Sequence, residues 1–517
     1  MKKNILYLIF IIISVNLFSQ NKYWVVFKNK KTTFNPYKYF DKKAITRRLK
    51  NNISLYDSTD FPINKKYKLI VNNIVDSITS ETRWFNALAV YADKSEINKI
   101  KKLPFVKYIR PITLSTYIAE YDYDTTLTYN KEQLRTMQLQ EMGGEYFAKK
   151  NITGKGVRIA IFDGGFPTVD VNPAFEHVRK NNRIIKTYDF TKKRKNVYYS
   201  ISHGTMVMSN ICGIVNGKKL GLATDAEFLL AKTEIKTEPF SEEENWLAAV
   251  EWADKNGADI INSSLGYTKQ RYFPWDMNGT SFVAQAANLA ARKGILVVNA
   301  AGNEGDTRSW KHLGTPADAD SALSVGGINP ETNTHISFSS YGPTADKRLK
   351  PNVCAFGKAV VSGKNKLKIE YGTSFASPLV AGFAACAKQT RPDITNMQLF
   401  NEIEQSANLY PYYDYAHGYG VPQAKYFTDN LRNSTSEKNF EFIDNYTSIN
   451  IKIINDKNNG QNILYYKIQN DNGIIDEYWA VKIKKNQSVT IPKKNKYKGK
   501  TLIAHYNGYN NSIKIKQ

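Results

Sequence analysis

The sequence of 517 residues predicts an α/β protein: a parallel β-sheet flanked by helices, preceded by a small α+β domain and followed by a β-sandwich. Three observations predict this fold class. Between Gly156 and about Asn430, apolar strands alternate with helical patterns, which is typical of βαβ units. Before that region, strands and helices are mixed over about 90 residues. Beyond Asn430, strand-like alternation continues without helices.

The composition is that of a globular protein, with 42% hydrophobic and 23% charged residues, and excludes a disordered or fibrous chain. Lys+Arg 72 against Asp+Glu 47 gives a net charge of +25, but the surplus is spread along the chain. We therefore expect no nucleic-acid partner. The alternative, a basic module that binds nucleic acid or an anionic surface, predicts binding that weakens steeply with salt.

Residues 1–19 are expected to form a signal peptide. Met1 to Asn4 contain two lysines and precede the apolar run Ile5–Phe18 of 14 residues. A membrane-spanning helix needs about 20 residues, and no later stretch reaches that length. The protein is therefore expected to be secreted or held at the cell surface, without a transmembrane segment.

The small domain is predicted over residues 20–111. Its expected strands and helices are Tyr23–Phe27, Tyr37–Lys50, Asn86–Ala92, Lys94–Lys102 and Phe105–Ile109. Residues 112–129, rich in Thr, Tyr and Asp without periodicity, are expected to be a linker.

The central domain is predicted over residues 130–430. Its expected buried strands are Val157–Phe162, Glu227–Lys232, Asp259–Ser263 and Ile295–Ala301. One helix is expected to begin at Ser241, which forms a capping box with Glu244. Another is capped by Thr280 or Ser281 and ends at Gly294.

The β-sandwich is predicted over residues 431–517 from alternating apolar positions. These are Ile449, Ile451, Ile453, Val489, Ile491, Leu502, Ala504, Tyr506, Ile513 and Ile515. Strong hairpin dipeptides punctuate the region: Asn459-Gly460, Asn472-Gly473 and Asn507-Gly508.

Three residues suited to nucleophilic catalysis remain once other kinds of active site are excluded. The sequence lacks the motifs of zinc proteases, P-loops and α/β-hydrolases. Asp163 ends a predicted strand and so lies at the carboxyl edge of the sheet, where open α/β sheets place their sites. His203 opens an apolar helical run, and Ser374 lies in a glycine turn before a helix of small residues.

These side chains fit nucleophilic catalysis. A serine hydroxyl needs a base to take its proton, and an imidazole titrates near neutrality, so His203 suits Ser374. Asp163 would orient the imidazole and stabilise its cation. Asn303, just after a predicted strand, could donate to an oxyanion beside the backbone N–H of Ser374.

With the order Asp, His, Ser, these segments resemble the subtilisin-like serine proteases over about Gly154 to Asn430. The matching segments are Ile161-Phe162-Asp163, His203-Gly204-Thr205, Ala301-Gly302-Asn303, Gly372-Thr373-Ser374, Ser337 to Pro343 and Lys350-Pro351-Asn352. The resemblance implies a subtilisin-like fold and hydrolysis of peptide bonds in protein or peptide substrates. It also implies that substrate lies against Ser264, Leu265, Gly266, Ala301 and Gly302. Tyr267, with the insertion-like stretch up to Asn278, is expected to reshape the cleft.

The resemblance gives the flanking regions a meaning as well. Residues 20–111 would be an inhibitory propeptide, removed by the enzyme itself within 112–129, so the protein would be made as a zymogen. An ordinary accessory domain is the alternative. Residues 431–517 resemble the sorting domains of subtilases exported by type IX secretion, which makes the secretion machinery a possible partner. A carbohydrate-binding or spacer sandwich is the alternative there.

Further expectations concern metal ions, the three cysteines and a catalytically inactive alternative. The chemistry requires no cofactor. Structural calcium is possible at Glu242, Glu243 and Glu244, although an exposed helix start explains these glutamates equally well. The thiols, Cys212, Cys354 and Cys386, are expected to be buried and free. A catalytically silent binding protein is a further alternative, which predicts loss of a triad group, and none is lost.

Overall fold

The structure is a computed structural model, and it describes residues 21–112, 129–235, 241–269, 271–364, 366–429, 437–455, 462–484 and 487–516. The chain divides into two compact units, one of residues up to Thr33 with Phe61–Thr113, the other of Phe34–Asp60 with all residues from Leu114. The expected signal peptide, most of the expected linker and the Asn459-Gly460 turn lie outside the described residues. None of the helices in the described ranges is both long and apolar enough to cross a bilayer.

The smaller unit is an antiparallel sheet with two helices. Its strand order is β2-β3-β1-β4. The elements are β1 (Asn21–Phe27), α3 (Lys65–Asn72), β2 (Ser77–Thr82), β3 (Ala87–Ala92), α4 (Lys94–Lys101) and β4 (Val106–Ile112). The sequence predicts β1, β3, α4 and β4, but not α3 or β2. Alternate residues of β3, Leu88 and Val90, pack with Ile97 and Ile100 of α4, so one face of the sheet is buried.

Residues 34–60 pack within the larger unit. They contain α1 (Pro36–Tyr39), α2 (Lys42–Lys50) and the short 3₁₀ helix η1 (Ser58–Asp60). A single helix was expected over Tyr37–Lys50, but it is divided because Asp41 caps α2. The Asp41 side chain accepts from the backbone N–H of Lys43 at 2.9 Å, and its own backbone is extended.

A buried charge network joins residues 34–60 to the central domain. Arg47 and Arg48 both contact Asp254, and the Arg48–Asp254 distance is 2.5 Å. Asp60 accepts from Arg48 at 2.7 Å and from Lys293 at 3.0 Å. Each of these residues is at most 4% exposed. Because the charges are removed from water, they need their partners, and α2 is fixed to the domain.

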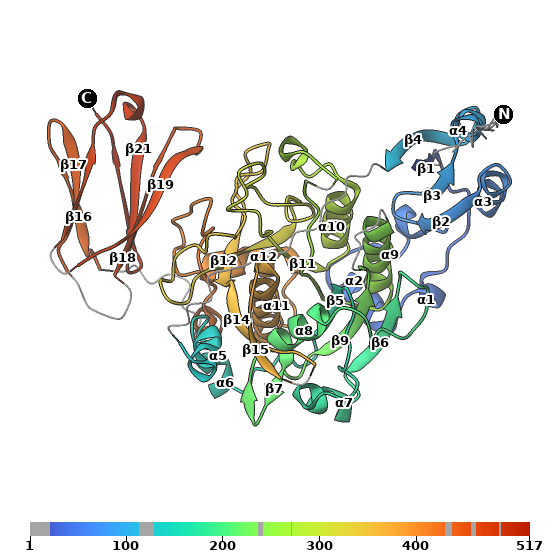
Figure 1. Ribbon diagram of the computed structural model, residues 1–517, viewed down its shortest axis with the longest axis horizontal. Helices are drawn as coiled ribbons and strands as arrows, with labels where there is room; N and C mark the ends of the chain where they lie inside the picture. The colour runs from blue at the N-terminus through green and yellow to red at the C-terminus, as the bar shows by residue number, and fades with distance from the viewer. Residues whose placement is uncertain are drawn as a thin grey trace, which may run out of the picture. The chain divides into compact units, whose positions relative to one another are not determined.

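The central domain is built on a parallel sheet with seven strands among the described residues (Figure 1). In sheet order these are β13 (Val353–Phe356), β12 (Ala322–Ile328), β11 (Leu296–Ala300), β10 (Ile260–Ser263), β5 (Arg158–Asp163), β9 (Glu227–Lys232) and β6 (Ile184–Asp189). The predicted fold class is confirmed, and the four predicted strands match β5, β9, β10 and β11 to within one residue at each end. The strands β6, β12 and β13 were not predicted.

Helices cover both faces of this sheet. The helices α8 (His203–Cys212) and α11 (Thr373–Thr390) pack together, and their apolar residues share a core with Ile161 of β5. The neighbouring Phe162 meets Trp246 of α9 (Ser241–Lys255), with ring centroids 5.7 Å apart. Successive strand residues point to opposite faces, so α9 lies on the face opposite α8. The helix α10 (Phe282–Arg292) packs beside α9 and is capped by Ser281, one of the two residues predicted for this cap.

The other elements of the central domain surround this sheet. They are α5 (Lys131–Gln140), α6 (Gly144–Lys149), α7 (Glu176–Lys180), β7 (Ile214–Val215), β8 (Lys218–Lys219), β14 (Lys358–Ser362), β15 (Leu367–Tyr371), α12 (Asn396–Ser406), α13 (Ala424–Thr428) and the 3₁₀ helices η2 (Pro173–Phe175) and η3 (Pro274–Asp276). The thiols of Cys212, Cys354 and Cys386 are free and buried, as expected.

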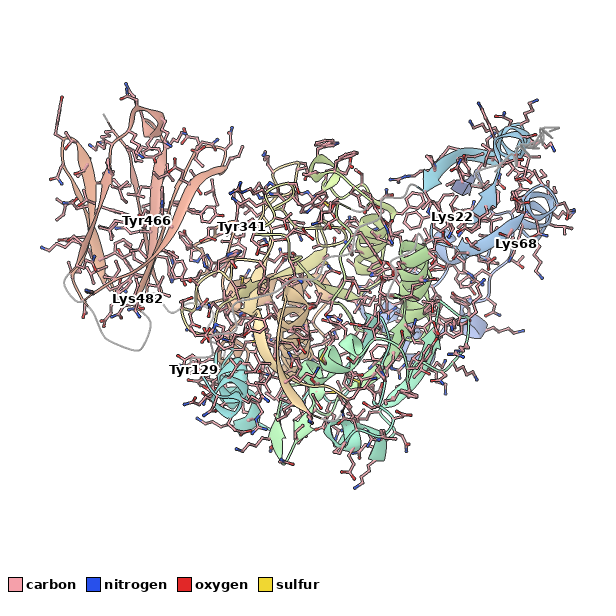
Figure 2. All side chains as sticks on the ribbon, viewed as in Figure 1. Lys22, Lys68, Tyr129, Tyr341, Tyr466 and Lys482 are labelled. Carbon is pink, nitrogen blue, oxygen red and sulfur yellow. The ribbon has the colours of Figure 1, made fainter. Side chains whose placement is uncertain are left out.

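The C-terminal region consists of two antiparallel sheets. Their strand orders over the described part are β16-β17-β20 and β19-β18-β21-β22. The elements are β16 (Phe440–Asp444), β17 (Ser448–Ile453), β18 (Ile463–Gln469), β19 (Ile475–Lys482), β20 (Ser488–Pro492), η4 (Asn495–Tyr497), β21 (Thr501–Tyr506) and β22 (Tyr509–Lys514). Residues of both sheets share one core, in which Tyr466, labelled in Figure 2, stacks on Trp479. The sequence predicts β17, β20, β21 and β22, but not β16, β18 or β19.

Candidate active site

Asp163 and His203 meet at the carboxyl edge of the parallel sheet. Asp163 is the last residue of β5 and is 1% exposed, while His203 is the first residue of α8. The Nδ1 atom of His203 lies 2.9 Å from Oδ2 and 3.1 Å from Oδ1 of Asp163. The carboxylate also accepts from the backbone N–H of Gly164 at 2.7 Å. Nδ1 therefore carries the proton toward Asp163, which leaves Nε2 as the basic nitrogen.

The pKa of His203 is raised above its ordinary value. Burial lowers this pKa, but the charge of Asp163 and its hydrogen bond, together with a contribution from Glu370, outweigh the burial. The His203 side chain is 28% exposed, so the ring is accessible from one side. A stabilised imidazolium is what a base needs after it has accepted a proton.

A second His–Asp pair differs in one decisive respect. His417 contacts Asp414 through Nδ1 at 3.0 Å and is 4% exposed. Its Nε2, however, accepts from the backbone N–H of His335 at 2.9 Å. Both ring nitrogens of His417 are thus engaged in the interior, so the geometry supports a structural role for this pair and a chemical one for His203.

Ser374 lies in the first turn of α11, directly after a glycine turn. Gly372 has φ +142°, in the region that favours glycine. A Cβ atom at Gly372 would stand 2.8 Å from the Oγ of Ser374 and 3.3 Å from Nδ2 of Asn303. The glycine therefore keeps open the space into which Ser374 and Asn303 both point. The ring of Phe375, the next residue, lies 5.4 Å from the ring of His203.

Asn303 is held so that its amide group faces this space. Its Oδ1 accepts from the backbone N–H of Thr373 at 2.8 Å and from the Thr373 hydroxyl at 2.9 Å. These two donors fix the oxygen on Thr373, so Nδ2 faces the side of Ser374. Phe375 donates its N–H to Gly372 at 3.0 Å, and the N–H groups of a first helical turn have no partner within the helix. The N–H of Ser374 belongs to this first turn, beside the Gly372 position that lies close to both the Oγ of Ser374 and Nδ2 of Asn303.

A buried polar chain that the sequence analysis missed fixes the start of α11 to the sheet. Ser377 donates to Asn262 at 2.9 Å, and Asn262 donates to Ser264 at 3.1 Å. Ser264 in turn donates to the carbonyl of Ser374 at 2.9 Å. Asn262 lies inside β10 and is fully buried. An asparagine inside a strand predicted to be buried was the one signal in the sequence, because a buried amide needs partners.

The residues expected to bind substrate fall into two groups. Beyond β10, a Cβ atom on Gly266 would meet nothing within 4 Å, so the chain there faces open space, and the Leu265 carbonyl accepts from Asn299 at 3.0 Å. Ala301, in contrast, is fully buried, and both its N–H and its carbonyl are engaged by backbone groups. Gly302 donates its N–H to the Thr373 hydroxyl at 3.2 Å.

The stretch after Gly266 is tied to the start of α9 by a buried acidic cluster. Tyr267 donates its hydroxyl to Glu234 at 3.1 Å. Arg271 contacts Glu242 at 3.1 Å and Glu243 at 3.4 Å, and its guanidinium lies 4.7 Å from the Tyr267 ring centroid. One guanidinium therefore pairs with two carboxylates, and the charge of a third, Glu234, also acts on it. Burial, and then the charge of Glu234, raise the pKa of Glu242 to about 10.

These contacts bear on the glutamates considered for calcium. Glu242 and Glu243 are turned toward Arg271, and Glu242 also accepts from the backbone N–H of Ile235 at 3.1 Å. Within the described ranges there is no group of three or more His, Cys, Asp or Glu that could hold a metal ion. The cluster is thus compensated by a cation of the chain itself.

Comparison with known proteins places these features in a family context. Residues 154–420 match the family described as "Subtilase family". Residues 22–124 match a second family, described as "Peptidase S8 propeptide domain, Bacteroidota".

The chain is also similar to individual proteins. Subtilisin E of Bacillus subtilis (strain 168) is 29% identical over 345 residues, which cover 66% of this chain and 81% of that protein. Subtilisin of Bacillus pumilus is 30% identical over 285 residues, covering 54% of this chain and 92% of that protein. Among solved structures, a protease of Pseudoalteromonas arctica PAMC 21717 is 22% identical with a TM-score of 0.46, over 57% of this chain and 97% of that one.

Proposed function

The chain belongs to the subtilase family and is a serine endopeptidase with an S8 propeptide domain, and from this premise we propose that Ser374, His203 and Asp163 carry its chemistry. Ser374 is the nucleophile, His203 the general base and acid, and Asp163 the group that orients His203. The contact of 2.9 Å between Asp163 and the Nδ1 of His203, at the sheet edge where α8 packs against α11, carries this assignment.

This geometry supports peptide-bond hydrolysis in two stages, acylation of Ser374 and then hydrolysis of the acyl-enzyme. The Oγ of Ser374 attacks the scissile carbonyl while Nε2 of His203 takes the hydroxyl proton, and the imidazolium formed is stabilised by Asp163. The oxyanion lies against Nδ2 of Asn303 and the N–H of Ser374. His203 then gives its proton to the leaving amine, and an acyl-enzyme remains. Water, deprotonated by His203, then attacks the ester, and His203 returns the proton to the Oγ of Ser374 as the acid product leaves.

The flanking regions are proposed to serve maturation and export. Residues 20–111 act as an inhibitory propeptide, and the enzyme itself cleaves within 112–129, so that the catalytic domain spans 130–430. Residues 1–19 direct export to the outside of the cell. Residues 431–517 are proposed to take part in sorting by the secretion machinery, with a spacer or carbohydrate-binding sandwich as the second candidate.

Metal ions play no part in the proposed chemistry. Subtilisins need no cofactor for catalysis and often bind structural calcium. Because Arg271 already compensates Glu242 and Glu243, we propose no calcium at these residues.

The deciding experiment compares the wild type with Ser374→Ala on a fluorogenic peptide library, with chain lengths read by mass spectrometry. We expect cleavage and a shortened chain from the wild type only. Ser488→Ala, in β20 of the C-terminal sheets, is the matched control and should behave as the wild type does. A Ser374→Ala chain that still shortens when purified alone contradicts self-processing. A wild type that loses its propeptide but cleaves nothing favours a binding role.

A separate experiment tests the C-terminal region. A reporter protein that carries a signal peptide and residues 431–517 should reach the medium, while the same reporter without them should stay in the periplasm. Equal distribution of the two reporters rejects sorting and leaves the spacer or carbohydrate-binding alternative.

A further inference from the structure

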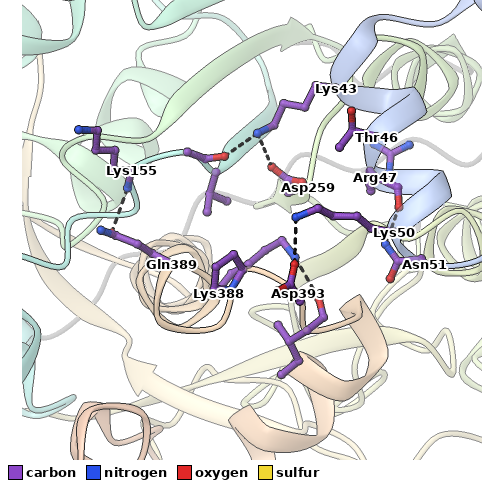
Figure 3. A pocket seen from close by; sticks show the side chains of 14 residues that line it. Lys43, Thr46, Arg47, Lys50, Asn51, Lys155, Asp259, Lys388, Gln389 and Asp393 are labelled. Atoms are coloured by element: carbon purple, nitrogen blue, oxygen red, sulfur yellow. Dashed lines mark hydrogen bonds and ion pairs between the residues drawn. The ribbon is translucent and has the colours of Figure 1, made fainter.

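A cavity lies where α2 meets the central domain, away from the residues assigned to catalysis. Its volume is about 230 Å³, whereas a single water molecule needs only about 10–15 Å³ of such space. Lys43, Arg47 and Lys50 line it from α2, and Lys155 and Lys388 line it from the central domain. In Figure 3 the side chains of Lys43, Lys50 and Lys388 reach toward one another across the cavity.

The lining is strongly basic. Five cationic side chains face two carboxylates, those of Asp259 and Asp393, which leaves a surplus of three positive charges (5 − 2 = 3). The ends of α2 and α11 also lie here, at Lys50 and Thr390. Each helix C-terminus contributes roughly half a negative charge, so the surplus is about two charges.

Two of these cations, Arg47 and Lys43, already have partners in the chain, although Lys43 uses only two of its three N–H donors. Arg47 contacts Asp254 and donates to the carbonyl of Lys293 at 3.1 Å. Lys43 contacts Asp259 at 3.1 Å and the carbonyl of Gly156 at 2.5 Å. The two buried acids near the cavity, Asp254 and Asp259, are thus paired with Arg47 and Lys43, and neither forms an ion pair with Lys50 or Lys388.

Lys50 and Lys388 are less well compensated. Lys50 contacts Asp393 at 3.0 Å, but their side chains are 50% and 88% exposed, so the pair is weak. Lys388 donates to the carbonyl of Ile394 at 3.1 Å, and no carboxylate within the described ranges lies at ion-pair distance from it. Burial lowers the pKa of Lys388, Asp259 opposes this, and Lys43, Lys50 and Arg47 lower it further.

We propose that this cavity binds a small inorganic oxyanion such as phosphate, held by Lys388, Lys50 and Lys43, with Lys155 at its edge. A compact oxyanion offers several acceptors to ammonium donors that approach from different sides, which a single carboxylate of the chain does not. Lys50 and Asp393 line the cavity and are both exposed, so an anion can reach Lys50 from solvent without unfolding.

Such an anion would strengthen the seam between residues 34–60 and the central domain. Lys43 and Lys50 belong to α2, whereas Lys388 belongs to α11, so the cations meet only when the two parts are assembled. A ligand that binds the assembled form alone stabilises it in proportion to its occupancy. Within the proposed function, the anion would therefore keep the propeptide on the catalytic domain. The binding itself does not depend on proteolysis.

The test uses the full-length chain with Ser374→Ala, so that both sides of the cavity stay on one polypeptide. Inorganic phosphate is titrated by calorimetry and by thermal unfolding, against sodium chloride at matched ionic strength. We expect saturable binding and a raised unfolding temperature with phosphate only. Lys388→Gln should raise the dissociation constant for phosphate about tenfold, as expected for the loss of one charge-assisted hydrogen bond.

Two further variants make the result decisive. Lys50→Gln, at an exposed position, should also weaken phosphate binding, while Lys180→Gln, whose partner is Glu176 on α7, should leave it unchanged. Equal effects of phosphate and chloride would show screening only and overturn the site. So would full binding in both the Lys388→Gln and Lys50→Gln chains. If proteolysis by Ser374 is disproved while these results hold, the anion site stands and only its link to maturation falls.

Discussion

Replacing Glu242 by Gln should make the stability of the catalytic domain less dependent on pH. The Glu242 side chain is 2% exposed and forms a hydrogen bond with Glu234, which is 8% exposed. The guanidinium of Arg271 contacts Glu242 and Glu243. Burial and the charge of Glu234 raise the pKa of Glu242 to about 10. At neutral pH the folded protein therefore keeps one proton on this pair of carboxyls, which an unfolded chain releases.

The direction and the magnitude of this pH dependence of stability follow from proton linkage. A glutamate in the unfolded chain has a pKa near its ordinary value of 4.5. Between that pH and about pH 10 the folded state binds more protons than the unfolded state, so its stability falls as pH rises. For one proton the slope is about 1.4 kcal/mol per pH unit, or about 3 kcal/mol between pH 7 and pH 9. A glutamine amide can donate to Glu234 as the protonated acid does, without this loss.

The assay is urea unfolding followed by tryptophan fluorescence, in the Ser374→Ala chain to prevent autolysis, at pH 7, 8 and 9. Glu242→Gln should lose much less stability over this range than its parent. Glu243→Gln removes a contact to the same guanidinium but leaves Glu234 and Glu242 together, and should keep the parental slope. Parallel pH curves for the parent and Glu242→Gln would refute the shared proton.

The remaining predictions concern catalysis and the seam. Asn303→Ala should lower kcat about 10²–10³-fold with KM little changed, in steady-state assays, because a donor to the oxyanion is lost. Since the pKa of His203 is raised by Asp163 and activity needs the neutral ring, kcat/KM should fall as pH drops, with a midpoint above the ordinary histidine value; a midpoint below it would contradict the coupling. Asp254→Asn should destabilise the full-length chain by about 3–5 kcal/mol in urea unfolding, because Arg47 and Arg48 then share a neutral partner, whereas Asp393→Asn should have little effect.

The parallel sheet could be predicted because its central strands are short apolar runs with clear ends. The strands β5, β9, β10 and β11 are buried on both faces and so stand out from their surroundings. Edge strand β6 is half-buried, with an exposed lysine inside it, and it was missed for that reason. The missed strand β18 contains Tyr465, Tyr466 and Lys467, all buried, and thus lacks the alternation of a half-exposed strand.

The contact between Asp163 and His203 was foreseen because a strand end and a helix start are placed by the sheet itself. The support around Ser374 was not foreseen, because Asn262 and Ser377 are 115 residues apart and only the folded chain brings them together. The same holds for Glu242, whose partner Arg271 lies in the insertion after Gly266. Interior polar contacts of this kind follow from packing, which no local pattern records.

Because α2 packs against the central domain, one cleavage within 112–129 does not by itself release the propeptide. Residues 34–60 lie in the sequence between the two parts of the smaller unit, yet they pack within the larger one. A Cβ atom at Gly257 would come within 2.8 Å of Lys43, so α2 fits closely against the end of α9. A cut within 112–129 leaves Arg48, Asp60 and their buried partners in place. Release of the propeptide then requires these charges to be exposed to water or the segment itself to be cut. Asp254→Asn, which weakens these contacts, should therefore let the cut propeptide leave the catalytic domain more readily.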